Sequence, residues 1–200
     1  MAAEGMTAGR ANQKLRTRNA IVQAAAELSR TGREVTMPEV AKAALVSEAT
    51  AYRYFPDLGS LLQEAIAGQL PGPEEALDPL SGSDDPVERI AAATEFLMRH
   101  ILGRQGVVRA LIAATITRPD QAQARPGLRF GLIDSALAPL DATLGVSDPA
   151  ALAQLKRGLA VVVSAEALFT LTDACGLDAE EAITSIVGTA AALTHAATSR

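Results

Sequence analysis

Residues 36–55 read TMPEVAKAALVSEATAYRYF and predict two short helices separated by a tight turn. Thr36 and Glu39 form a capping-box pattern before the first helix, and Pro38 lies in the first turn, where a missing N–H is harmless. Ser47 is the candidate cap of the second helix. Two helices arranged in this way form a helix-turn-helix, in which the second helix is suited to the major groove of DNA.

The second predicted helix has an inward and an outward face. At about 100° per residue, Ala51 and Phe55 point toward a core. The candidate DNA-contacting side chains on the outward face and its flanks are Ala49, Thr50, Tyr52, Arg53 and Tyr54. Arg53 is suited to a bidentate contact with guanine O6 and N7, and a phosphate contact is almost equally open to it. Ala49 and Thr50 could touch a thymine methyl group or a base edge.

Other side chains are expected at phosphates, which position a protein without reading sequence. Tyr52 and Tyr54 are candidate donors, and Thr36 and Ser47 could present hydroxyl and backbone N–H groups or simply cap their helices. Glu48 could accept from cytosine N4, pair with a nearby basic group or be solvated, and solvation is the simplest of the three.

A basic segment precedes the helix-turn-helix. Between Gly9 and Ala20 the chain carries four basic residues and no acidic one, and these are Arg10, Lys14, Arg16 and Arg18. Such a segment can neutralise phosphates, and its contribution to binding should fall with salt. A solvated tail is the alternative for Arg10, whereas Arg16 and Arg18 lie inside a predicted helix.

The run VSEATAYRYFPDLGSLL, residues 46–62, resembles the DNA-binding signature of the TetR family of bacterial transcriptional regulators. The upstream run LRTRNAIVQAAAELSRTG, residues 15–32, resembles the first helix of that family. The resemblance covers about residues 13 to 68. It implies an all-α fold, with an N-terminal three-helix helix-turn-helix domain and a C-terminal helical domain for ligand binding and dimerisation.

Two positions depart from the family pattern. Leu45 stands where the family usually has Gly, and a slightly different turn is expected because Leu does not easily adopt φ > 0. Leu58 stands where the family often has Lys, so one phosphate contact at the start of the next helix is in doubt.

Composition narrows the classes of protein. The chain has 200 residues, of which 48% are hydrophobic and 3% aromatic, enough for a helical core. The single cysteine, Cys175, excludes an internal disulfide and fits a reducing cytoplasm. The most apolar stretch, residues 158–171, contains Glu166 and is too short for a membrane span. His100 and His195 give no metal-ligand spacing, and no cofactor is expected.

Charge is distributed unevenly along the chain. The net charge is −5, but residues 1–70 hold eight Lys/Arg and seven Asp/Glu, whereas residues 71–200 hold ten and sixteen. The N-terminal part is therefore the better partner for DNA.

Pro, Gly and Ser clusters suggest the domain boundaries. We expect a flexible basic arm at 1–11, a DNA-binding domain at 12–70, an exposed linker at 71–86 and an effector-binding and dimerisation domain at 87–200. Periodicity and caps predict nine helices, near residues 12–30, 37–44, 47–54, 58–69, 86–102, 106–117, 127–144 with a kink at Pro139, 149–176, and from 178 onward.

The last two predicted helices suggest a homodimer. A helix that is apolar nearly all round must be covered on every side, and a two-fold partner can do this by forming a four-helix bundle. The expected contacts are Leu159, Val163, Ile183, Ile186, Val187 and Ala190. A monomer whose last helix lies across its own core is the alternative.

The resemblance also implies a small-molecule effector, and polar residues within apolar helical runs are the candidates for binding it. They are Arg99, His100, Thr115, Glu166, Thr170 and Asp173. On one long helix Glu166, Thr170 and Asp173 would share a face and suit a cationic or hydrogen-bonding ligand. Alternatively, the acids pair with Arg99 or Arg109, or line the dimer seam.

No motif for catalysis is present, because the sequence lacks a phosphate loop, a nucleophile elbow and a zinc-protease helix. The predicted function is a cytoplasmic, ligand-responsive transcriptional regulator that binds a near-palindromic site on double-stranded DNA, and a repressor is favoured. Two alternatives stay open. Either the C-terminal domain serves only to dimerise or bind protein, or the helix-turn-helix is degenerate in a small-molecule-binding protein.

Overall fold

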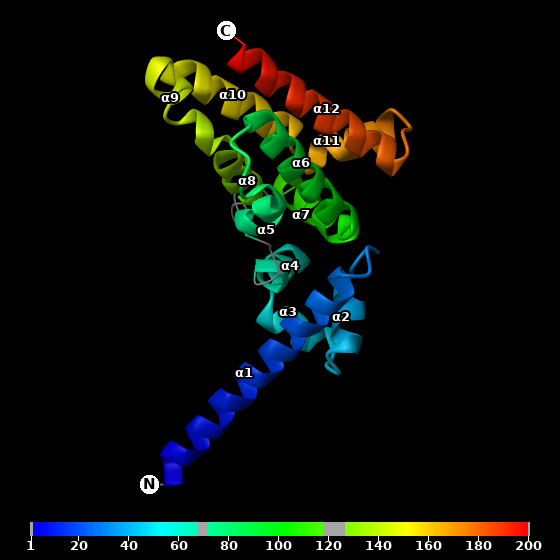
Figure 1. The fold of residues 1–200 in the computed structure, drawn as a ribbon. Helices are drawn as coiled ribbons and strands as arrows, with labels where there is room; N and C mark the ends of the chain where they lie inside the picture. Colours follow the sequence, from blue (N-terminus) through cyan, green and yellow to red (C-terminus); the bar gives the residue numbers. More distant parts are fainter. Residues whose placement is uncertain (1, 68–71, 118–126, 200) are drawn as a thin grey trace. The chain divides into compact units, whose positions relative to one another are not determined.

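The described residues fold entirely as helices. The computed structural model describes residues 2–67, 72–117 and 127–199, and within these ranges it contains helices and no strand (Figure 1). The predicted all-α class is confirmed. The chain divides into two compact units, Met1–Leu70 with Gly103–Pro126, and Pro71–Leu102 with Gly127–Arg200.

The N-terminal unit is built from five helices. They are α1 (Ala2–Ser29), α2 (Met37–Ala43), α3 (Glu48–Tyr54), α4 (Leu58–Ala67) and α7 (Gln105–Thr117). Helix α1 packs against α2 and α4, α2 packs against α3, and α4 packs against α7. Their shared core is apolar and includes Ile21, Val40, Ala51, Phe55, Leu61, Leu62 and Val107. Ala51 and Phe55 therefore point inward, as the periodicity predicted.

The place of α7 differs from the predicted division, which put all residues from 87 onward in the C-terminal domain. The start of α7 approaches the loop after α1 so closely that a Cβ atom on Gly106 would lie 2.0 Å from the carbonyl oxygen of Arg33. The next residue, Val107, is buried in the N-terminal core. The missing side chain of Gly106 thus allows α7 to join this unit.

The turn between α2 and α3 is closed by two backbone hydrogen bonds. The N–H of Leu45 donates to the carbonyl of Lys42 (3.2 Å), and the N–H of Val46 donates to the carbonyl of Ala41 (2.9 Å). This pattern is a Schellman motif, whose left-handed position is usually glycine. Leu45 occupies that position with φ 57° and is 92% exposed. The turn therefore has the backbone conformation that usually requires glycine, although the residue at the left-handed position is Leu45.

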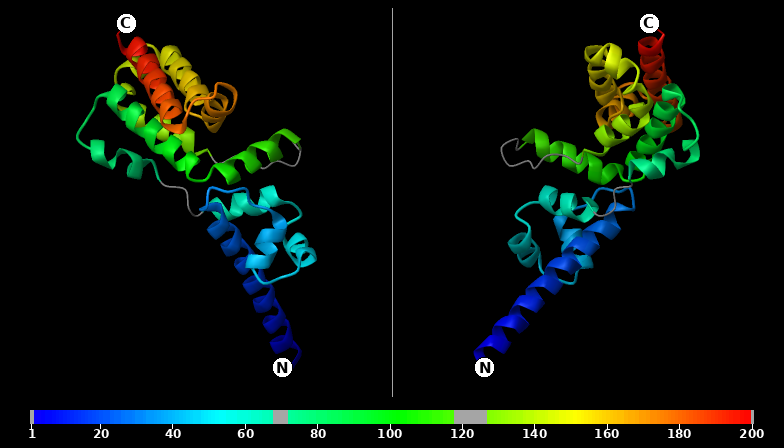
Figure 2. Two further views of the ribbon diagram at one scale, coloured as in Figure 1. Left: turned by 90° about the vertical axis from the view of Figure 1, so that its right-hand side faces the viewer. Right: turned by 60° about the vertical axis from the view of Figure 1, so that its left-hand side comes forward.

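The C-terminal unit packs its long helices side by side (Figure 2). Its elements are α5 (Pro73–Leu77), η1 (Asp78–Leu80), α6 (Pro86–Leu102), α8 (Leu128–Leu137), η2 (Ala138–Leu140), α9 (Leu144–Ser147), α10 (Pro149–Val162), α11 (Ala165–Phe169), the π-helical segment η3 (Thr170–Ala174) and α12 (Ala179–Thr198). Helix α12 packs along α6 and α10, and α6 also contacts α5 and α8. Buried leucine, isoleucine and methionine side chains fill the space between them.

The segment predicted as an exposed linker is partly folded. Within residues 71–86, α5 and η1 form two short helices, and Ala76 and Leu77 are buried. The Arg89 guanidinium also holds this segment, because it donates to the carbonyl of Ser83 (3.1 Å) and to that of Ser135 on α8 (2.8 Å). The Pro- and Gly-rich composition does not indicate these contacts, because the bond to Ser135 joins residues far apart in the chain.

Two of the long predicted helices are broken. The helix expected at 149–176 ends at Val162, where Val163 takes ψ 67°, and Ser164 then caps α11 by accepting from the N–H of Ala167 (3.1 Å). The helix expected at 127–144 ends at Leu137, and the 3₁₀ turn η2 carries Pro139. Proline lacks the N–H that would continue an α-helix, so the expected kink is a full break.

Helix α12 agrees with the expectation from sequence. Asp178 is its N-cap and accepts from the N–H of Glu181 (2.9 Å), while the Glu181 side chain accepts from the N–H of Asp178 (3.1 Å).

Among the described helices, none combines the length and the apolar character needed to cross a bilayer.

Candidate nucleic-acid interface

Helix α3 is anchored by its cap and by its buried face. The Ser47 hydroxyl accepts from the N–H of Thr50 (3.2 Å) and donates to the Thr50 hydroxyl (3.0 Å). One turn further, Ala51 is fully buried and so fixes which side of α3 faces the core. The opposite side of the helix is therefore presented to solvent in one defined orientation.

The outward face of α3 consists of Glu48, Ala49, Tyr52 and Arg53, all exposed. Tyr52 is 49% exposed. The guanidinium of Arg53 lies 5.7 Å from the centre of the Tyr54 ring, and among the described residues it makes no ion pair or hydrogen bond. Its donors are thus available for a bidentate contact with a base or phosphate.

The Thr36 hydroxyl is engaged within the fold. It donates to a carboxylate oxygen of Glu39 (2.8 Å), and the same carboxylate accepts from the Thr36 N–H (3.1 Å). The Thr36 hydroxyl also accepts from the N–H of Glu39 (3.4 Å), and this bond and the one from the Thr36 N–H form the capping box at the start of α2. Capping therefore explains Thr36 without a phosphate, and Ser47 is the more exposed of the two cap hydroxyls.

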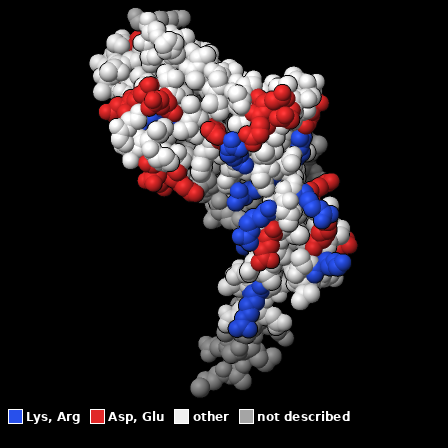
Figure 3. All heavy atoms as spheres, turned by 45° about the vertical axis from the view of Figure 1, so that its right-hand side comes forward, with Lys and Arg blue, Asp and Glu red and all other residues white. Residues whose placement is uncertain are grey.

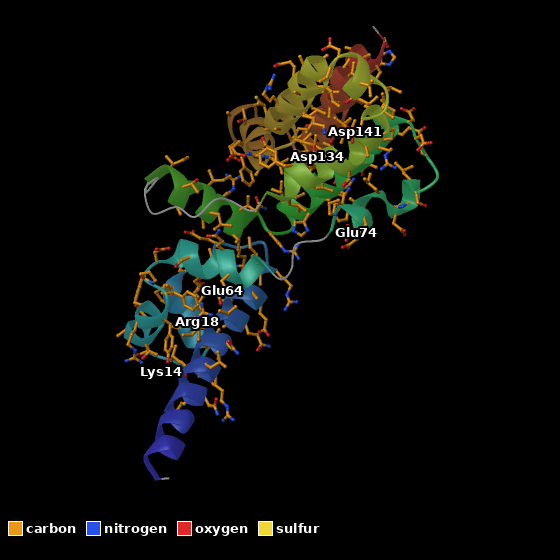
Figure 4. All side chains as sticks on the ribbon, turned by 90° about the vertical axis from the view of Figure 1, so that its left-hand side faces the viewer. Lys14, Arg18, Glu64, Glu74, Asp134 and Asp141 are labelled. Carbon is orange, nitrogen blue, oxygen red and sulfur yellow. The ribbon has the colours of Figure 1, made fainter. Side chains whose placement is uncertain are left out.

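The predicted basic residues of α1 differ in what they contact. Lys14 and Arg16 are exposed, as a phosphate contact requires. Arg18 instead forms a bidentate pair with Glu64 of α4, and its guanidinium lies 5.0 Å from the centre of the Phe55 ring (Figure 4). Arg18 thus joins α1, α4 and the end of α3, and its contact with DNA stays a prediction.

The position of Leu58, where the family often has Lys, is half-buried at the start of α4 and packs against the N-terminal core. The cap of α4 is Asp57, which accepts from the N–H of Ser60 (2.8 Å). Leu58 therefore stabilises the fold and cannot supply the phosphate contact that a lysine would make.

The two units differ more in net charge than residues 1–70 and 71–200 do. The N-terminal unit has twelve Lys/Arg and eight Asp/Glu, a formal charge of +4, and the C-terminal unit has six and fifteen, a charge of −9. Figure 3 shows Lys and Arg interspersed with Asp and Glu on the visible face of the N-terminal unit, and mostly Asp and Glu on that of the C-terminal unit. The additional positive charge comes from residues 103–126.

The predicted effector residues are divided between the two units. Thr115 lies on α7 in the N-terminal unit, whereas the other five belong to the C-terminal unit. Glu166 pairs with Arg129 (3.5 Å), and Thr170 donates to the Glu166 carbonyl (2.8 Å). Because α11 gives way to the π-helical η3, the three residues predicted to share a face do not lie on one regular helix.

Arg99, another of these residues, bridges two carboxylates at the surface. Its guanidinium pairs with Glu180 (2.8 Å) and with Glu95 (2.9 Å). The hydrogen bond from Arg99 lowers the pKa of Glu180, and the same bond raises the pKa of Arg99. His100 is half-buried on α6, and the Asp173 carboxylate accepts from the Thr172 hydroxyl (2.9 Å).

Most of the predicted dimer contacts lie inside the C-terminal unit itself. Leu159, Val163, Ile183, Ile186 and Ala190 are buried, and Val187 is half-buried. The outer faces of α10 and α12 carry other side chains, among them Val161, 73% exposed, and Leu193, 38% exposed. This part of the fold agrees with the alternative in which the last helix covers its own core.

A groove of about 540 Å³ lies between α9, α10 and α12. It is lined by Leu144, Ser147, Asp148, Ala151, Gln154, Leu155, Gly158, Leu193, Ala196 and Ala197. None of the predicted effector residues lines it. In the described part of the chain, no group of His, Cys, Asp and Glu side chains is arranged to hold a metal ion.

A capped helix-turn-helix with an exposed Arg- and Tyr-bearing second helix defines a DNA-binding protein of the helix-turn-helix class. Residues 20–65 match the family model described as "Bacterial regulatory proteins, tetR family". The match covers residues 20–65 of the 200-residue chain and confirms the resemblance to the TetR family of transcriptional regulators noted in the sequence.

One solved structure with a similar fold is the crystal structure of a TetR transcriptional regulator from Rhodococcus sp. RHA1. The two chains are 24% identical, the match covers 90% of this chain and 96% of the other, and the TM-score is 0.49. No curated protein matches the sequence significantly.

Proposed function

We propose that this chain is a TetR family regulator, a cytoplasmic homodimeric repressor that binds a near-palindromic operator and leaves it when a small molecule binds the C-terminal unit. The observation that supports this most is the outward face of α3, where Arg53 has no competing partner among the described residues. Tyr52 and Tyr54 flank it and supply phosphate contacts, as do Lys14 and Arg16 on α1.

A dimer is supported by the small number of base pairs that one recognition helix can contact. Helix α3 has seven residues and spans about 10 Å, or roughly three base pairs, which is too little sequence for a unique site. Two copies would contact half-sites about 34–36 Å apart. The outer faces of α10 and α12 supply the contact, because Gly158 and Gly188 have open space around them and would allow close helix packing.

Release by an effector requires that the small molecule prefer one arrangement of the dimer over another. The chain passes from one unit to the other on both sides of the segment Gly103–Pro126, and α7 within that segment packs on α4. A ligand that shifts the start of α7 would therefore act on α4 and, through the Arg18–Glu64 pair, on the end of α3. The groove beside α10 and the polar residues of α6 and α11 are candidate binding places.

The test is a mobility-shift assay with the purified chain and the DNA upstream of its own gene. Arg53→Ala should weaken binding to that DNA by about tenfold or more, the value of one bidentate base contact. Arg30→Ala is the matched control, because Arg30 is exposed just beyond α1 and lies outside the helix-turn-helix. Equal binding of the wild-type protein to upstream and random DNA would contradict operator recognition.

A regulator without an effector is the second candidate, and it is favoured by the ion pairs that already engage Arg99 and Glu166. In that case the C-terminal unit serves only to hold the dimer together. Screening small molecules for release of the DNA complex separates the two, with sedimentation analysis to establish whether the released protein is still a dimer.

A further inference from the structure

The acidic residues in and around the helix-turn-helix differ in whether they form hydrogen bonds or ion pairs within the fold. Residues 36–67 contain four carboxylates, Glu39, Glu48, Asp57 and Glu64. Three of them are engaged, one in the capping box of α2, one at the start of α4 and one with Arg18. Glu48 is exposed, and its carboxylate has no hydrogen-bond or ion-pair partner among the described residues.

Glu48 also lies at the end of α3 where base contacts are made. It is the first residue of α3, and the N-terminal residues of a recognition helix contact base edges. The next outward residue is Ala49, whose side chain is a single methyl group. Glu48 is therefore the only long side chain that this end of the outward face presents, with Tyr52 one turn further along.

The chemistry of a carboxylate restricts what it can approach on DNA. A carboxylate is repelled by phosphates and by the acceptors of guanine and thymine, because when ionised it has no proton to donate. Among base edges in the major groove, cytosine N4 offers a donor that glutamate accepts from. Adenine also has a donor, but the acceptor N7 lies beside it and is better matched by glutamine.

We infer that Glu48 is a specificity-determining residue, which accepts a hydrogen bond from cytosine N4 in each half-site and disfavours the other bases there. The inference rests on the DNA binding proposed above. Arg53 is five residues further along α3, about 7.5 Å or roughly two base-pair steps. A guanine read by Arg53 should therefore lie about two base pairs from the cytosine read by Glu48 if α3 follows the groove.

The experiment is selection of bound fragments from random DNA by the full chain and its Glu48→Gln variant. The wild-type motif should hold a cytosine at one position of each half-site, and Glu48→Gln should replace that cytosine by adenine and leave the other positions unchanged. Exchange of this cytosine in a synthetic operator should weaken wild-type binding on the order of tenfold. Glu34→Gln, which removes an exposed acid outside α3, should leave the motif intact.

The outcomes separate a base contact from a solvated side chain. If Glu48 is only solvated, Glu48→Gln binds every sequence more tightly and selects the same motif, which overturns the inference. If Arg53→Ala changes the motif and Glu48→Gln does not, only the role of Glu48 fails. If the wild-type protein selects no motif, the proposed function fails and the role of Glu48 fails with it. Circular dichroism melting confirms that the variants are folded.

Discussion

The two units of this protein differ in which of their charged side chains have partners within the fold. Within residues 36–67 of the N-terminal unit, caps and one ion pair engage three of the four carboxylates, while Glu48 and Arg53 face outward on α3 without a hydrogen-bond or ion-pair partner among the described residues. In the C-terminal unit, Arg99, Arg129 and Lys156 each pair with a carboxylate, and Lys156 lies near both Asp134 (2.9 Å) and Asp141 (3.8 Å). A surface for recognition must keep some polar groups without internal partners, whereas a scaffold gains by pairing them.

The largest effect should come from the place where α7 joins the N-terminal unit. Gly106→Ala puts a Cβ atom 2.0 Å from the Arg33 carbonyl oxygen, and backbone atoms cannot yield cheaply. We expect a loss of about 3 kcal/mol in the free energy of unfolding, measured by denaturant titration. Hydrogen exchange should locate the loosening in the N-terminal unit.

Gly82→Ala is the control for that variant, because nothing lies within 4 Å of its new Cβ atom. Equal stability of the two variants would show that α7 does not pack against the loop after α1.

The corresponding test of the C-terminal unit removes the donors of Arg89. Arg89→Met keeps the aliphatic stem but leaves the carbonyls of Ser83 and Ser135 without their charged donor. We expect a loss of about 2 kcal/mol, with faster hydrogen exchange in α5 and the end of α8. Arg157→Met is the control, since Arg157 bonds only Gln154 on its own helix. No difference between them would contradict a structural role for Arg89.

A smaller effect, of opposite sign, is expected in the turn before α3. Leu45 holds φ 57°, a conformation that costs an L-residue about 1–2 kcal/mol. Leu45→Gly should raise the free energy of unfolding by about 1 kcal/mol after the greater freedom of glycine in the unfolded chain is counted. Ala44→Gly, at φ −78°, is the control and should destabilise. A stability loss in Leu45→Gly would mean that the side chain contributes contacts despite its exposure.

The smallest effect concerns the exposed pair of Arg99 and Glu180. Because the arginine lowers the pKa of Glu180, the pair's contribution is present above the ordinary glutamate pKa of about 4.3. It is lost as the pH falls through the lower pKa of the folded state. The small difference in melting temperature between wild type and Glu180→Gln should therefore vanish in acid. A difference that persists at low pH would assign it to another cause.

Local features were predictable because they depend on neighbours in the chain. The capping box at Thr36 and the cap at Ser47 were expected, and the structure contains both. The inward direction of Ala51 and Phe55 followed from helical periodicity alone. For the same reason, the sequence defines which face of α3 is proposed to contact DNA.

Features that depend on distant residues could not be predicted. A phosphate contact was the natural expectation for Arg18, because its partner Glu64 lies 46 residues away. The burial of Leu159 and Ile183 within one chain depends on how α6, α10 and α12 pack together. The small size of Gly106 lets α7 join the N-terminal unit, and this depends on the closeness of the Arg33 carbonyl in space.

The order of amino acids alone determined an all-helical chain whose residues 36–55 form a capped helix-turn-helix, since hydrogen bonds over three or four positions decide caps, turns and faces. Only the tertiary structure decided which charges remain free on that element and which are neutralised. Pairing between side chains depends on distance in space, and distance in space is set by packing of helices that lie far apart along the chain.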